Sequence, residues 1–291
     1  MSVENEPTDW VDVPGGRLPV WRSGTGEPMV LLHGGPSLND YLGSILPELD
    51  GFEAIRYQQR SIAPATLEAP FTVEQHLADL EAVLDSLRLE RPWLLGHSWG
   101  GHLALHALVA LPGRFAAAVI VDPLGALPER PGTFEAMLRR DLTDAERGRL
   151  EELDEREAAG MMTNSEALES LDIVWRNYHH DRQQPPPAPL TEVNLPALEA
   201  TMASVGEHLA AGTLRDRLPD VETPAVFVHG ASSPLDPSHS RDSAALLANA
   251  TVVVVEGAGH FPWLERPGSV AGGIAAFRRD ARPPLEAPPL H

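Results

Sequence analysis

Short apolar runs recur along the first part of the chain and again near its end. Runs of this kind, bounded by Gly, Pro or polar residues, are typical of buried β-strands. They occupy residues 18–22, 29–32, 53–57, 92–96, 117–121, 225–229 and 251–255. Leucines recur at helical spacing over residues 72–88, where Thr72 and Gln75 fit a capping box, and residues 99–111 are apolar nearly all round. This alternation predicts an α/β fold with a mostly parallel sheet and helices on both faces.

The pattern changes in the middle of the chain. Residues 125–218 contain helical, highly charged segments and a proline-rich break, without a strand-like run. We therefore expect an α/β core made of residues 1–124 and 219–281, with a helical cap inserted at 125–218. The last residues, 282–291, form a Pro-rich tail that we expect to be poorly ordered.

A serine lies where one predicted strand turns into a helix. Ser98 is the third residue of the run GHSWGG (96–101), and it is the serine of the pattern G-x-S-x-G formed by residues 96–100. At such a turn the hydroxyl projects from the carboxyl edge of a parallel sheet and can attack a substrate. The alternative is an ordinary turn with an N-capping serine. The strand before the motif and the helix after it favour a nucleophile.

Two other segments supply the groups that a serine nucleophile needs. The glycines of the run HGGP (33–36) follow a predicted strand and allow a close backbone approach. We expect the amides of Gly35 and Trp99 to bind the oxyanion of a tetrahedral intermediate. His260 follows the last predicted strand on a glycine-rich loop, and we expect it to accept the proton of Ser98.

The motifs HGGP and GHSWGG, together with the stretch GAGHFPWLERP (257–267), resemble the proline-iminopeptidase-related branch of the α/β-hydrolase superfamily. The resemblance implies the α/β-hydrolase fold with an inserted helical cap, and serine chemistry without a cofactor. It covers two core segments well and the cap poorly, so it does not specify a substrate. The run YQQR (57–60) departs from the Asp-Gln-Arg-Gly of the iminopeptidases, because Gln58 replaces the Asp and Ser61 the Gly.

A serine nucleophile and its histidine need a third, acidic residue to complete a catalytic triad. The position of this acid also departs from the family pattern. In this superfamily the acid usually lies on the loop after the strand that precedes the histidine's strand, three residues beyond the Gly that ends it. Here that strand is 225–229 and the Gly is Gly230, so Ser233 occupies the acid position. A serine cannot balance an imidazolium ion. We favour Asp122, which follows the predicted strand 117–121, because certain dehalogenases and lactonases carry the acid at this earlier position. Asp236, another group, or a Ser–His dyad are the alternatives.

We expect the substrate pocket to lie beneath the cap. The candidate lining residues are apolar, aromatic or close to the oxyanion loop. They are His33, Trp175, Tyr178, Met161 and Met162. His102 and His106 have a metal-like spacing, but no H-E-x-x-H glutamate accompanies them, so we expect packing histidines and no metal.

Composition narrows the classes of partner. The chain has 22 Lys and Arg against 42 Asp and Glu, a net charge of −20 that repels nucleic acid and anionic membranes. It has no Cys, which excludes disulfides, thiolate metal sites and cysteine nucleophiles. The acidic N-terminus does not resemble a signal peptide, and no clean transmembrane segment is present. We therefore expect a cytoplasmic protein that acts on a small molecule, and we predict no particular oligomeric state.

These observations predict a serine hydrolase that cleaves a small ester, lactone or amide through an acyl-enzyme on Ser98. One alternative is an aminopeptidase of the proline-iminopeptidase type, whose acidic cap would bind a free amine. Another is a non-catalytic ligand-binding protein on the hydrolase scaffold, which Ser233 at the usual acid position would favour.

Overall fold

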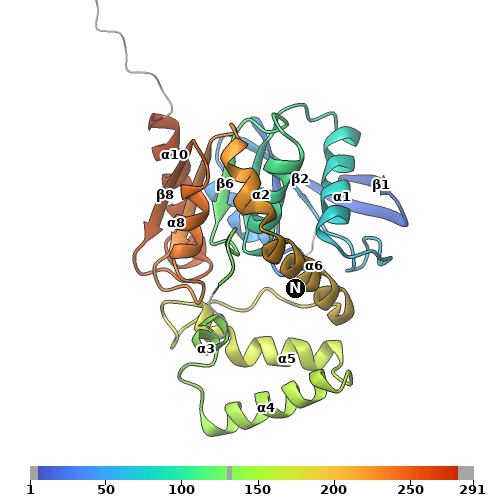
Figure 1. Ribbon diagram of the computed structural model, residues 1–291, viewed down its shortest axis with the longest axis vertical. Coiled ribbons are helices and arrows are strands. Elements are labelled where there is room, and N and C mark those ends of the chain that lie inside the picture. The colour runs from blue at the N-terminus through green and yellow to red at the C-terminus, as the bar shows by residue number, and fades with distance from the viewer. Residues whose placement is uncertain (1–5, 130–132, 281–291) are drawn as a thin grey trace, which may run out of the picture.

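The protein is described by a computed structural model that covers residues 6–129 and 133–280 (Figure 1). Within these residues eight strands form one sheet in the order β1-β2-β4-β3-β5-β6-β7-β8. The strands are β1 (Asp9–Val13), β2 (Gly16–Gly24), β3 (Glu27–Leu32), β4 (Phe52–Tyr57), β5 (Trp93–His97), β6 (Ala118–Val121), β7 (Ala225–Gly230) and β8 (Ala250–Val255). β2 pairs antiparallel with β1 and β4, and the other neighbouring pairs are parallel.

Helices lie between most of the strands. They are α1 (Val73–Ser86), α2 (Trp99–Ala110), α3 (Thr133–Leu138), α4 (Asp144–Ala158), α5 (Asn164–Val174), α6 (Leu195–Ala211), α7 (Thr213–Arg217), α8 (Ser238–Ala245), α9 (Pro262–Glu265) and α10 (Ser269–Asp280), with 3-10 helices η1 (Leu42–Glu48), η2 (Trp175–Tyr178) and η3 (Leu218–Asp220). Every strand expected from the apolar runs forms. β1 was not among them, because it has only two core positions, Val11 and Val13, which alternate with polar residues.

Successive side chains of the central strands enter two hydrophobic clusters, one on each face of the sheet. In β5, Leu94 belongs to the cluster that includes residues of α1 and α2. Trp93 and Leu95 belong to the cluster that includes residues of η1 and α10. Because side chains alternate along a strand, burial on both faces requires an apolar residue at every position. This explains why the strands read as continuous apolar runs.

The expected capping box at α1 is only half correct. The Thr72 hydroxyl accepts a hydrogen bond from the Gln75 amide at 3.3 Å. The Gln75 side chain donates to Asp79 at 3.1 Å instead of returning to the Thr72 backbone. Asp79 is buried with Arg60, and its carboxylate directs the Gln75 side chain along α1.

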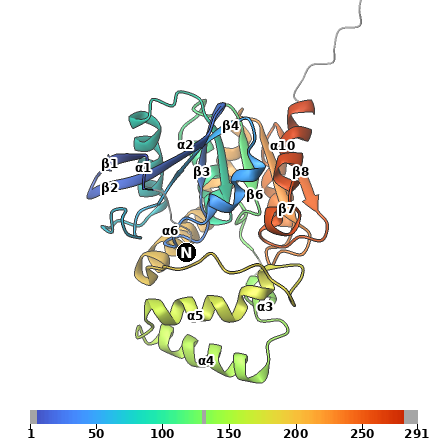
Figure 2. The same ribbon diagram turned by 180° about the vertical axis from the view of Figure 1, so that it is seen from behind.

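The stretch 125–218, which we expect to form a cap, has two parts. α3, α4 and α5 form a unit that stands away from the sheet in both views (Figures 1 and 2). α6 instead lies against the body, where the Val73 amide at the start of α1 donates to the Ser204 hydroxyl at 3.2 Å. The Pro-rich tail at 282–291 lies outside the described residues.

Ion pairs and helix caps hold the protruding part of the cap together. Thr143 and Thr163 begin α4 and α5 with capping boxes. Four acidic side chains of the two helices pair with arginines, in the pairs Arg139–Asp154, Arg149–Glu169, Arg156–Glu166 and Arg176–Glu146. Solvent screens these exposed pairs, so each contributes little to stability by itself. These carboxylates therefore serve the cap's own structure.

Candidate active site

Ser98 lies at a sharp turn between β5 and α2. Its backbone has φ 56° and ψ −120°, a conformation that a residue with a side chain rarely adopts. The turn also needs its flanking glycines. A Cβ at Gly96 would lie 2.2 Å from the Gly100 carbonyl oxygen, and one at Gly100 would lie 2.0 Å from the Leu32 carbonyl oxygen. The structure therefore builds the strand–turn–helix setting expected for a nucleophile.

The HGGP loop touches the serine. A Cβ at Gly34 would lie 2.7 Å from Ser98 Cβ, so only a glycine allows this approach. The Gly34 amide donates to the Tyr41 hydroxyl at 2.9 Å. By contrast, the amides of Gly35 and Trp99 have no hydrogen-bond acceptor among the described residues. These two donors are available to a substrate oxygen.

His260 is bound to a carboxylate. Asp122 follows β6 and is fully buried, and its Oδ1 lies 2.8 Å from His260 Nδ1. Asp122 Oδ2 accepts the Gly230 amide at 2.9 Å. The Ser233 hydroxyl donates to Asp122 Oδ1 at 2.6 Å, and its oxygen lies 3.5 Å from His260 Nδ1. The hydroxyl at the usual acid position thus supports a carboxylate that comes from the neighbouring strand.

The other acid candidate lies elsewhere. Asp236 is exposed, and its carboxylate accepts the Ser238 amide at 2.8 Å, next to the start of α8. Within the described parts of the chain, no hydrogen bond or ion pair joins Asp236 to His260. The structure therefore brings Asp122 and His260 together, and it leaves Asp236 at the surface.

Burial shifts the pKa values of both members of the pair. Desolvation raises the pKa of the Asp122 carboxyl, and His229, the Ser233 hydroxyl and the Gly230 amide oppose this rise. Desolvation also lowers the pKa of His260, and nearby His179 adds to the effect. A lowered pKa keeps the His260 imidazole neutral at pH 7, the form that can accept a proton from a hydroxyl.

A buried hydrogen-bond chain joins the oxyanion loop to the His260 loop. His97 Nε2 donates to the His260 carbonyl oxygen at 2.8 Å, because a carbonyl can only accept. His97 Nδ1 then accepts the Tyr41 hydroxyl proton at 2.6 Å, and Tyr41 in turn accepts the Gly34 amide. His97 was not among the predicted site residues, although it directly precedes Ser98. Tyr41 was missed because it lies 56 residues from its partner.

Two glutamines hold the oxyanion loop from the core side. Gln58 Oε1 accepts the Asp40 amide at 2.7 Å, and its Nε2 donates to the Leu38 carbonyl at 3.0 Å. Gln59 Oε1 accepts the Trp99 indole N–H at 2.9 Å. The YQQR run, which departs from the iminopeptidase pattern, is therefore part of the scaffold beneath the candidate site.

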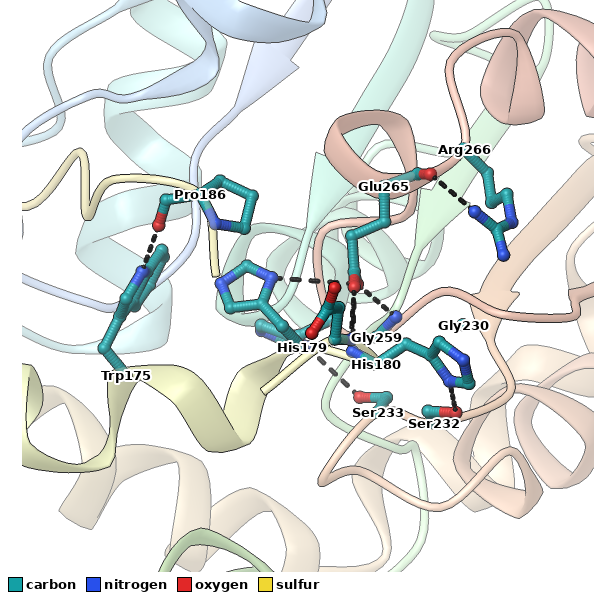
Figure 3. Close-up of polar contacts among 12 residues, drawn as sticks. Trp175, His179, His180, Pro186, Gly230, Ser232, Ser233, Gly259, Glu265 and Arg266 are labelled. Carbon is teal, nitrogen blue, oxygen red and sulfur yellow. Dashed lines mark hydrogen bonds and ion pairs between the residues drawn. The ribbon is translucent and has the colours of Figure 1, made fainter. Parts of the chain in front are cut away.

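The candidate pocket residues fall into two groups. Trp175 and Tyr178 lie beside the His260 loop. The Tyr178 ring centroid is 5.4 Å from that of His260, and the Tyr178 carbonyl accepts the His260 amide at 2.7 Å. Trp175 packs against Phe261 and donates its indole N–H to the Pro186 carbonyl (Figure 3).

The structure does not place the other three pocket candidates against His260. Met161 is 57% exposed at the turn between α4 and α5. Met162 packs against two small clusters of cap residues, one of which also includes Leu38 of the oxyanion loop. His33 is fully buried, with Nδ1 donating to the Gly34 carbonyl and Nε2 accepting the Gln59 amide. His33 therefore shapes the oxyanion loop from beneath.

Glu265 joins the cap to the loop that carries His260. Its carboxylate accepts the Gly259 amide at 2.6 Å and the His180 and Asp181 amides at 2.9 and 3.0 Å (Figure 3). His179 is buried beside it, with Nδ1 3.7 Å from Glu265 Oε2. Three amides on one carboxylate make a tight junction between cap and core.

His102 and His106 pack against each other on α2, with ring centroids 4.9 Å apart. In the parts of the chain that the structure describes, no group of three or more His, Cys, Asp or Glu side chains is arranged to hold a metal ion. Across the same residues, no helix combines the length and the hydropathy needed to cross a bilayer.

Residues 29–272 match the sequence model of the alpha/beta hydrolase family. The chain belongs to this family. Membership confirms the predicted fold class and supports hydrolase activity. Membership does not specify the substrate, because proteins of this family that resemble the chain act on different substrates.

Among curated relatives, proline iminopeptidase of Lactobacillus delbrueckii subsp. lactis is 26% identical over 254 residues, which cover 82% of this chain and 85% of that protein. A 2-hydroxy-6-oxo-2,4-heptadienoate hydrolase of Pseudomonas putida is 33% identical over 126 residues, 39% of this chain and 44% of that one. The solved structure of a proline iminopeptidase from Mycobacterium smegmatis superposes with a TM-score of 0.64 at 24% identity, covering 94% of this chain and 97% of that chain. These likenesses confirm the resemblance to the proline-iminopeptidase branch.

Proposed function

We propose that the protein is a serine hydrolase that transfers an acyl group to Ser98 and then to water. Ser98 Oγ attacks the substrate carbonyl carbon while His260 takes the hydroxyl proton. The amides of Gly35 and Trp99 bind the oxyanion of the tetrahedral intermediate. His260 then gives its proton to the leaving alcohol or amine, and an activated water cleaves the acyl-enzyme.

One observation carries the proposal. Asp122 Oδ1 lies 2.8 Å from His260 Nδ1, so the imidazole has the acid that fixes its tautomer and balances its positive charge. The strained backbone of Ser98 and the two unpaired amides complete the required set of groups. The same observation argues against a non-catalytic binding protein, because the carboxylate missing at position 233 is supplied by Asp122 after the neighbouring strand.

We propose a small ester, lactone or amide as the substrate class, held between the sheet edge and the cap. Trp175 and Tyr178 give the cap side of this region an aromatic surface next to His260. Aromatic walls with a few directed polar groups are typical of small-molecule sites.

An active-site probe and a substrate panel test the proposal. A fluorophosphonate should label wild-type protein at Ser98 and leave Ser98→Ala unlabelled. The wild type should hydrolyse p-nitrophenyl esters or lactones, with Ser98→Ala as the matched control. An unlabelled Ser98 in folded wild-type protein would contradict the proposal and favour a binding protein.

The second candidate function is removal of an N-terminal residue from peptides. The relationship to proline iminopeptidases over 82% of the chain favours it. The acids of α4 and α5 that pair with arginines do not supply a free carboxylate for a substrate amine. Turnover of proline β-naphthylamide alone, without ester or lactone hydrolysis, would support the peptidase and exclude the esterase.

A further inference from the structure

A segment of the cap lies along the loop that carries Gly35. This strap, residues 189–194, connects the proline-rich stretch to α6, and Figure 2 shows the chain crossing between the sheet and α5 before it enters α6. Val193 forms a β-bridge with Leu38. The Asn194 amide donates to the Ser37 carbonyl at 3.0 Å. The oxyanion loop thus has the cap on one side and Gln58 on the other.

Asn39 forms side-chain hydrogen bonds between the loop and the strap. Its Nδ2 donates to the Pro189 carbonyl at 3.0 Å. Its Oδ1 accepts the amides of Thr191 at 2.8 Å and Glu192 at 3.2 Å. One amide side chain therefore joins three residues of the cap, across 150 residues of sequence in the case of Pro189. Its polar atoms are used here for a contact between cap and loop.

Leu38 connects Asn39 to the oxyanion donor. The Leu38 amide donates to the Gly35 carbonyl at 3.0 Å and closes a tight turn over residues 35–38. The Leu38 side chain packs so closely that a Cβ at Gly35 would lie 2.2 Å from its Cδ1. Leu38 also packs with Val193 and Leu195 of the strap and α6. A shift of the strap would therefore reach the backbone of Gly35 through one intervening residue.

We propose that Asn39 is a positioning residue that holds the Gly35 amide where the oxyanion forms, by fixing the 189–194 strap to the oxyanion loop. This inference rests on the acyl-transfer function proposed above. Such a donor contributes only when it is correctly placed, and errors of about 1 Å cost on the order of 10²-fold in rate. The cap then takes part in transition-state stabilisation besides enclosing the substrate.

The test compares Asn39→Ala with wild type on p-nitrophenyl butyrate and on its thiono analogue, in which sulfur replaces the carbonyl oxygen. A sulfur anion accepts hydrogen bonds poorly, so the oxygen-to-sulfur ratio of kcat/KM reports how much the oxyanion donors contribute. We expect Asn39→Ala to lower kcat on the oxygen ester by about 10- to 100-fold with KM nearly unchanged, and to lower the ratio. Asn249→Ala, an exposed control in hydrogen-bond contact with the Glu222 carbonyl, should change neither.

A second pair of variants acts from the strap side. Thr191→Pro removes the N–H that donates to Asn39 Oδ1, whereas Thr191→Ala keeps it. Thr191→Pro should reproduce the fall in kcat and in the oxygen-to-sulfur ratio, and Thr191→Ala should behave as wild type. The fall in kcat of the double variant Asn39→Ala/Thr191→Pro should be smaller than the product of the two single falls, because both changes remove the same hydrogen bond.

Several results would overturn the inference. One is a folded Asn39→Ala protein with unchanged kcat, which would mean that Gln58 holds the loop alone. Another is a raised KM alone, which would make the strap a substrate contact. A third is a lower Tm with an unchanged oxygen-to-sulfur ratio, which would make Asn39 purely structural. If wild type itself neither labels with fluorophosphonate nor turns over either ester, the proposed function fails, and this outcome differs from all three.

Discussion

Two loops from neighbouring strands reach the imidazole of His260, and they carry different chemistry. The loop after β6 supplies a fully buried carboxylate, Asp122, 2.8 Å from Nδ1. The loop after β7 supplies a hydroxyl, Ser233, whose oxygen lies 3.5 Å from the same nitrogen, and it exposes Asp236 at the surface. Because parallel strands end at a common edge, an acid on either loop can face one histidine. What decides whether an acid can pair with the histidine is its position in the fold and not its position in the sequence.

The largest expected difference between the two loops is in kcat. Asp122→Asn should lower kcat by about 10⁴, because an amide neither fixes the required imidazole tautomer nor balances its charge. Asp236→Asn, the matched control, should keep nearly full activity. Steady-state kinetics on the best ester substrate checks both. A loss of less than about tenfold in Asp122→Asn would transfer the role to another group.

Removal of the hydroxyl from the second loop should have an intermediate effect. Ser233→Ala deletes the 2.6 Å hydrogen bond to Asp122. A hydrogen bond to a charged group contributes about 1.5–3 kcal/mol, so we expect kcat to fall roughly tenfold or more. Ser232→Ala is the control, since its hydroxyl contacts His180 instead. Equal kinetics for the two alanine variants would show that Ser233 only fills space.

The pH profile should separate the roles of the two loops further. Burial lowers the pKa of His260 from its ordinary value of 6.5, so the acid limb of kcat/KM should lie below pH 6.5. The Ser233 hydroxyl lowers the pKa of Asp122. Ser233→Ala should therefore raise the pKa of Asp122. Because a protonated Asp122 no longer holds His260 in its catalytic tautomer, the acid limb should move to higher pH. An acid limb at the same pH in Ser233→Ala and wild type would show that Ser233 does not influence the ionisation of Asp122.

The smallest expected effect concerns the stability of the second loop. Asp236 accepts the Ser238 amide, and this hydrogen bond lowers the pKa of its carboxyl from 3.8. The stabilisation is thus present above pH 3.8 and fades as the pH falls below it. Because solvent screens this exposed group, Asp236→Asn should reduce the free energy of unfolding by less than about 1 kcal/mol. Urea denaturation at pH 7 measures the change, and a loss of several kcal/mol would contradict a surface role.

The strands and the residues at their ends could be predicted from the sequence, because both follow from local patterns. Buried strands are continuous apolar runs, and Ser98 and His260 lie next to such runs on glycine-rich turns. The choice of Asp122 over Asp236 rested instead on the resemblance to family members that carry the acid after the earlier strand. That choice concerns placement only, and the kinetic variants above test its catalytic role.

The supporting contacts could not be predicted, because they join segments that are far apart in sequence. Asn39 meets Pro189 across 150 residues, and Glu265 meets His180 across 85. Neither residue belongs to a local motif that shows its partner. The positions of single cap residues could not be predicted either. Met161, expected in the pocket, lies at an exposed turn because the cap helices fold into a hairpin. Apolar character alone does not show which face of such a hairpin meets the core.

The hydrogen bond between His260 and its acid can be observed directly by proton NMR. An imidazole N–H bound to a carboxylate resonates far downfield of ordinary amides, and the spectrum can be compared among the wild type, Asp122→Asn and Asp236→Asn. We predict that the resonance is present in the wild type and in Asp236→Asn, and that it is absent from Asp122→Asn. A resonance that persists in Asp122→Asn and disappears from Asp236→Asn would contradict the assignment of Asp122 as the partner of His260.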